Sequence, residues 1–85
     1  MKEISEIEMC ENLIYDNKVE LAKSRIMDRL HQRMLLSGER GVKELMAMNQ
    51  SKIRTLEQML KHLTDIHSAL LEEREKKVDN EATKT

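Results

Sequence analysis

Two glycines, Gly38 and Gly41, separate two long stretches in which apolar residues recur every three or four positions. That spacing is the period of an α-helix with one apolar face. Gly38 follows Leu36 and Ser37 at the end of the first stretch, and glycine readily adopts the left-handed conformation that ends many helices. A short loop makes the two helices antiparallel neighbours. The sequence therefore predicts an all-α fold, an antiparallel helical hairpin that turns at residues 37–41.

The second stretch carries the clearer pattern, because its apolar residues fill three adjacent heptad columns. The columns are Val42, Asn49, Leu56, Leu63 and Leu70, then Leu45, Lys52, Met59 and Ile66, then Met46, Ile53, Leu60 and His67. Three columns make a wider apolar face than the two-column seam of a coiled coil, although the packing is of the same kind. We expect a helix over most of 42–76, a single hairpin domain over 1–78 and a disordered tail over 79–85.

The first stretch predicts a helix over most of 19–36, preceded by a weak point near Asp16. Its apolar residues are Ile4, Ile7, Cys10 and Ile14, then Val19, Ala22, Ile26, Leu30 and Met34. Asn17 is suited to cap a new helix, with Glu20 as its partner three residues on, so the first helix is split there in one interpretation. In the other, one continuous helix runs through with Asp16 and Asn17 facing solvent. The sequence leaves both open.

The composition indicates a helical chain with a small core. The 85 residues include no Pro, Phe or Trp, and Tyr15 is the only aromatic residue. A chain of this size buries little apolar surface, and a two-helix hairpin with a wide apolar face leaves part of that face in water. We therefore expect a protein that is marginally stable alone and that associates with itself or with a helical protein partner.

Sequence features that bear on location favour the cytoplasm. The longest apolar run, residues 45–48, is far too short to span a membrane. The acidic start, MKEISEIE, lacks the basic segment and apolar core of a secretory signal. Cys10 is the single cysteine, so it forms no internal disulfide and fits a reducing compartment.

The candidate chemical groups predict no catalysis. His62 and Asp65 share a helix face, but His67 does not have the four-residue spacing from His62 that helical zinc sites use. Cys10 lies among acidic residues, which disfavour a reactive thiolate, and we interpret it as a small apolar residue. A phosphate-binding loop is also missing from the sequence. We expect no enzymatic activity, no cofactor, no metal and no nucleic-acid partner.

Each of two polar features of the sequence has two interpretations, and both stay open. Arg25, Arg29 and Arg33 form a basic stripe on the first helix, which is either a solvated face or a contact for an acidic partner. Asn49 interrupts an apolar column, where it either fixes the register of a helix pair or lies at the rim. The apolar face of the second helix is the predicted partner-binding site. Its residues are Leu56, Met59, Leu60, Leu63, Ile66 and Leu70.

The segments 26–34 (IMDRLHQRM) and 55–60 (TLEQML), with the glycine turn between them, resemble the small co-chaperones of type III secretion needle subunits, the YscE/EscE type. The resemblance implies a cytoplasmic helical hairpin in a heterodimer with a larger helical-repeat chaperone. The two proteins would together hold the needle subunit and stop it polymerising.

A second resemblance, carried by residues 55–63 and 72–75, is to the oligomerisation region of H-NS-type nucleoid proteins. It implies an oligomerisation modulator of a nucleoid or transcription protein, although the chain carries no recognisable DNA-binding part. A third interpretation rests on the helical pattern alone and makes the chain a coiled-coil subunit of a multiprotein scaffold. The three functional hypotheses differ in the partner that they require.

Overall fold

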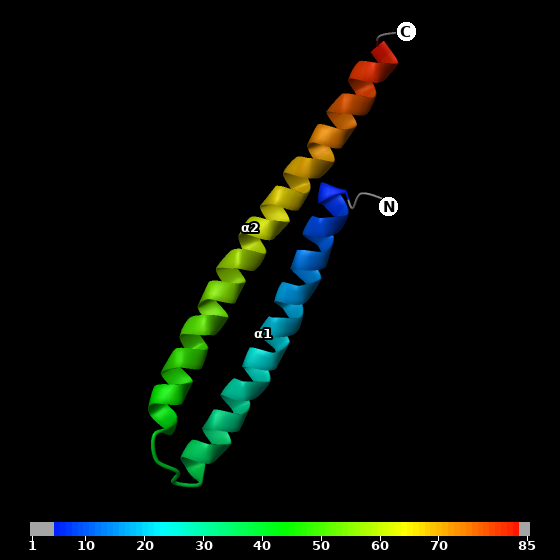
Figure 1. Cartoon of the computed structure of the whole chain (residues 1–85). Coiled ribbons are helices and arrows are strands. Elements are labelled where there is room, and N and C mark those ends of the chain that lie inside the picture. Colours follow the sequence, from blue (N-terminus) through cyan, green and yellow to red (C-terminus); the bar gives the residue numbers. More distant parts are fainter. Residues whose placement is uncertain (1–4, 84–85) are drawn as a thin grey trace.

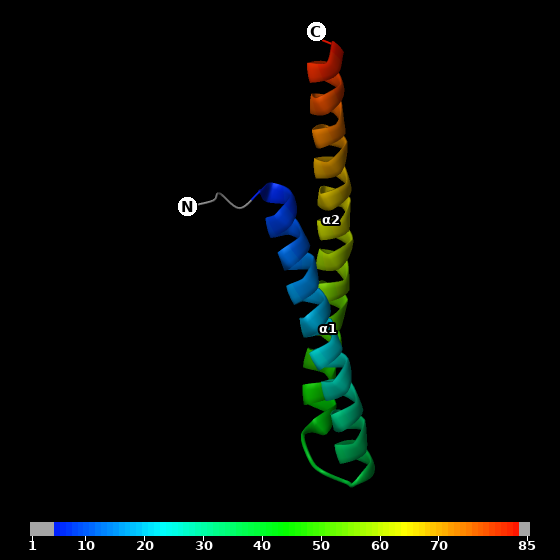
Figure 2. The same ribbon diagram turned by 90° about the vertical axis from the view of Figure 1, so that its right-hand side faces the viewer.

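In a computed structural model, which describes residues 5–83, the chain forms two long helices joined by a short turn. Helix α1 spans Glu6–Leu36 and helix α2 spans Val42–Thr83. The helices run antiparallel in a single layer and are inclined to each other (Figures 1 and 2). No strand occurs within the described range. The predicted all-α helical hairpin, with its turn at 37–41, is confirmed.

Helix α1 is continuous through Asp16 and Asn17, so the split interpretation is wrong. The helix begins after Ser5, whose side-chain oxygen accepts a hydrogen bond of 3.1 Å from the backbone N–H of Glu8. A serine followed three residues later by glutamate is a capping signature. Asp16 is exposed, as the continuous alternative expected, but Asn17 points inward and is only 5% exposed.

The turn depends on its two glycines. Gly38 has a φ of +78° and Gly41 a φ of +77°, a region that residues with a Cβ rarely adopt. The backbone N–H groups of Ser37, Gly38 and Glu39 donate to carbonyl oxygens in the last turn of α1. These bonds satisfy acceptors that the helix end would otherwise leave free.

The seam between the helices joins one heptad column from each. Cys10 Sγ donates to the Leu63 carbonyl oxygen at 3.4 Å, and Asn49 Nδ2 donates to the Ser24 carbonyl oxygen at 2.7 Å. Both contacts fit a single register, because Ser24 follows Cys10 by fourteen residues on α1 and Asn49 precedes Leu63 by fourteen residues on α2. Asn49 therefore lies in the seam, where its amide donates a hydrogen bond across the helix pair.

The seam column of α1 is mainly polar, which was not expected from the sequence. Its members are Cys10, Asn17, Ser24 and His31, and all four are buried. Over residues 5–76, the only buried apolar residues are Cys10, Leu21 and Val42. The hairpin consequently has a very small apolar core.

Most of the predicted apolar stripe of α1 from Val19 to Met34 does not pack against α2, although Val19 and Met34 are half-buried. Ile26 is 67% exposed and Leu30 47% exposed, while Ala22 is also exposed. Ile4, the first residue of the predicted pattern, lies outside the described residues.

Helix α2 is longer than α1, 42 residues against 31, and it extends past the first residue of α1 (Figure 1). It continues to Thr83, whereas the sequence placed the end of the domain at residue 78. The disorder predicted for residues 79–85 stays a prediction, and residues 84–85 lie outside the described range.

Candidate partner-binding groove

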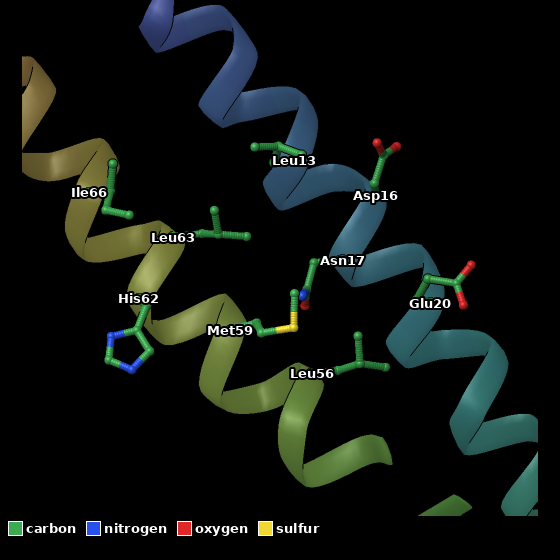
Figure 3. A pocket seen from close by; sticks show the side chains of 9 residues that line it. All are labelled: Leu13, Asp16, Asn17, Glu20, Leu56, Met59, His62, Leu63 and Ile66. Atoms are coloured by element: carbon green, nitrogen blue, oxygen red, sulfur yellow. The ribbon is translucent and has the colours of Figure 1, made fainter.

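A groove of about 440 Å³ runs along one flank of the hairpin, between the two helices (Figure 3). In Figure 3, Leu56, Met59 and Leu63 extend from α2 toward α1. The groove is lined by Leu13, Asp16, Asn17 and Glu20 from α1, and by Leu56, Met59, His62, Leu63 and Ile66 from α2. Its apolar residues remain partly in water, because Leu13 is 47%, Met59 48% and Ile66 51% exposed.

The groove lies beside the polar part of the seam. Opposite Leu56 the register places Asn17, so an amide stands there in place of an apolar side chain. Leu13 and Met59 lie beside the seam on the same flank, and no third element covers them among the described residues. The apolar surface is therefore accessible to another molecule.

Charged side chains close the groove at the end nearer the turn. Glu20 Oε2 lies 3.6 Å from Lys52 Nζ across the two helices, and Glu20 Oε1 lies 3.5 Å from Lys23 Nζ. These side chains are 44–67% exposed, so the pairs add little stability. Glu20 of α1 and Lys52 of α2 therefore face each other at the same level of the hairpin.

Asn17 brings an unsatisfied amide to the groove. Its Nδ2 and Oδ1 atoms are buried and have no hydrogen-bond partner among the residues that the structure describes. His31, in the same seam column, has a buried Nδ1 in the same condition. A buried polar group without a partner costs about 1–3 kcal/mol, so the seam contains a local energetic weakness.

The structure divides the six predicted partner-binding residues. Leu56, Met59, Leu63 and Ile66 line the groove. Leu60 and Leu70 are half-buried and do not belong to its lining. Met59 follows Leu56 by three residues and Leu60 follows Leu56 by four, so Met59 and Leu60 lie on opposite sides of the seam. Leu60 is therefore separated from the groove.

The sequence interpretation missed the contribution of α1. Met9, Leu13, Met27 and Leu30 are 42–47% exposed and lie on the flank that carries the groove. Leu13 and Met27 are separated by two heptads, a signal present in the sequence. Helix α1 carries two apolar stripes, and the sequence interpretation followed the one through Ile26 instead of the one through Leu13 and Met27.

That second stripe lies on the outer side of α1, away from the seam. Tyr15 is 69% and Ile26 67% exposed, and Val19 and Ala22 fall between them at helical spacing. The chain thus has apolar side chains on two separate faces of α1.

The remaining candidate groups take simple positions. Cys10 is buried against Leu63 and has a free thiol. His62 lies at the outer edge of the groove, and no set of three metal-ligating residues occurs in the described part of the chain (Figure 3). Arg25, Arg29 and Arg33 are exposed. Within the described residues, neither helix has a stretch long and apolar enough to cross a membrane.

Comparison with known proteins gives no relative. No family model matches the chain, and no curated protein or solved structure is detectably similar to it.

Proposed function

We propose that this chain is a non-catalytic protein–protein interaction module that takes an apolar helix of a partner protein into its groove. The observation that carries the proposal is the exposed apolar groove on a hairpin that has almost no core of its own. An apolar helix laid into such a groove buries surface that would otherwise contact water. The paired helices present Leu13 from one side and Met59 and Ile66 from the other.

A small cytoplasmic co-chaperone is the role that this arrangement supports best. Such a protein pairs with a larger helical protein and gains stability from the complex. The resemblance of residues 26–34 and 55–60 to co-chaperones of type III secretion needle subunits is the reason to propose needle-subunit handling as the specific pathway.

A matched pair of methionine variants tests the proposal. Met59→Asp places a charge in the groove, whereas Met48→Asp makes the same change at a site on α2 that is 72% exposed and outside the groove lining. Tagged wild-type and variant proteins are used for affinity capture from a lysate of the source organism, followed by mass spectrometry. We expect a helical protein that wild type and Met48→Asp retain and Met59→Asp loses.

Circular dichroism on the same samples separates a lost interface from lost folding. Equal capture of every protein by all three samples, with helix content unchanged, would exclude the groove as the docking site. A captured type III secretion chaperone or needle subunit would support the specific pathway.

The outer stripe of α1 favours a second candidate, a subunit of a multiprotein scaffold. A scaffold subunit contacts neighbours on more than one side, and Tyr15 and Ile26 lie on a face that the groove does not use. Tyr15→Asp tests this candidate. Loss of a captured protein that Met59→Asp still retains would support the scaffold role.

A further inference from the structure

The residues on the flank that carries the groove are arranged with an internal two-fold symmetry. Docking of a helix from an unrelated protein would not require such a symmetry. On α1, the heptad column farthest toward this flank is Met9, Asp16, Lys23 and Leu30. Read in reverse, the column exchanges Met9 with Leu30 and Asp16 with Lys23. An antiparallel copy of this helix would therefore place apolar against apolar and acid against base.

Around their centres, the neighbouring columns have the same symmetry. Next to the groove, Leu13 and Met27 lie at equal distances from Glu20, and on α2 Leu45 and Met59 lie at equal distances from Lys52. The four apolar side chains are 42–48% exposed. Inversion about Glu20 exchanges Leu13 with Met27, and inversion about Lys52 exchanges Leu45 with Met59. Met34 and Ile66, farther from the centres, have no apolar counterpart.

The two centres of inversion lie at the same level of the hairpin. Glu20 is the centre on α1, Lys52 is the centre on α2, and their charged atoms are 3.6 Å apart. One two-fold axis through this level therefore serves both helices. A closed dimer with a self-complementary face requires such an axis.

We infer that a second copy of this chain occupies the groove in the free protein, forming an antiparallel four-helix dimer whose two-fold axis passes beside Glu20 and Lys52. The inference rests on the proposed function in one respect, since the second copy and the partner helix use the same groove. Met27 and Leu45 of the second copy enter the groove beside Leu13 and Met59. A partner must displace the second copy to bind.

The available surface is sufficient for a stable dimer. A 31-residue helix is about 46 Å long, and two adjacent helices are about 20 Å wide. The flank therefore offers roughly 900 Å² on each copy, or about 1,800 Å² in total, within the usual range of about 1,200–2,000 Å² for specific interfaces.

A charge exchange tests the arrangement. Sedimentation equilibrium at low salt is measured for the full chain, for Asp16→Lys, for Lys23→Asp and for the double variant. Each single variant puts like charges together at both symmetry-related contacts, so we expect the dimer dissociation constant to rise roughly tenfold or more. The double variant restores opposite charges and should return to within about threefold of wild type.

Helix content from circular dichroism identifies any variant that has lost its fold, and Met59→Asp should abolish the dimer. A wild-type protein that stays monomeric up to millimolar concentration would overturn the inference. So would a double variant no better than the single ones, because a parallel dimer does not bring Asp16 against Lys23.

The capture experiment keeps the two proposals distinct. A monomeric wild-type protein whose partner is lost with Met59→Asp removes the second copy and leaves the proposed function. Charge rescue of the dimer, together with capture that is indifferent to Met59→Asp, leaves the dimer and removes the proposed function.

Discussion

Asn17→Leu should stabilise the hairpin, although it replaces a polar residue in the middle of a helix. Asn17 is 5% exposed and both polar atoms of its amide lack a hydrogen-bond partner among the described residues. Such a group costs about 1–3 kcal/mol, and leucine removes this cost while adding apolar contact to Leu56 and Met59. We expect the free energy of unfolding to rise by about 1–3 kcal/mol.

The change is large enough to measure by thermal and urea unfolding, followed by circular dichroism. For a domain of this size, about 1 kcal/mol corresponds to a shift in Tm of roughly 4–8 °C. The matched control is Asn12→Leu, because Asn12 is exposed on the same helix. Both variants gain the same helix propensity, so their difference isolates the buried amide.

An Asn17→Leu variant that is no more stable than Asn12→Leu would refute this reasoning. It would mean that the Asn17 amide is fully hydrogen-bonded in solution and that the seam has no such weakness. The measurement is made at several protein concentrations, so that any change in self-association is separated from a change within the hairpin.

Three further predictions concern the interface, the turn and assembly. Leu60→Ala and Leu63→Ala should each cost about 1–2 kcal/mol of stability, because both leucines are half-buried, but only Leu63→Ala should also weaken partner binding. If both variants keep full helicity and bind the partner as tightly as wild type, the leading interface becomes the exposed stripe of Arg25, Arg29 and Arg33, where binding would weaken with added salt. Gly38→Ala should cost about 1–2 kcal/mol in urea unfolding, because φ at this residue is +78° although nothing lies within 4 Å of the added Cβ; an unchanged midpoint would contradict this. The Tm of the wild-type protein should rise with its concentration, and a Tm that is constant and high would show that the lone hairpin is stable.

The hairpin could be predicted because its signals are local. Gly38 and Gly41 are the only glycines, and both take the left-handed conformation that the turn needs. The spacing of apolar residues on α2 also places Leu56, Met59 and Leu63 on one face, where the groove lies. Each of these features depends on residues within a few positions of one another.

The seam of α1 could not be predicted from apolar periodicity, because its column is largely polar. Asn17, Ser24 and His31 are buried there, while Ile26 on another face is exposed. Which stripe of α1 meets α2 depends on the pairing with residues more than twenty positions away. The capping signature at Ser5 and Glu8 was present in the sequence and predicts the observed helix start better than Asn17 does.

The polar seam has a consequence for binding that follows from where the apolar surface lies. Closing the hairpin buries only Cys10, Leu21 and Val42 among the apolar residues within 5–76, and it buries the Asn17 amide without a partner among the described residues. Leu13 and Met59 meanwhile stay about half exposed beside the seam. Docking of another helix therefore has apolar surface left to bury that hairpin formation does not use. The small core predicts a weakly held hairpin, so we expect the helices to adjust to the occupant of the groove and folding to be coupled to binding.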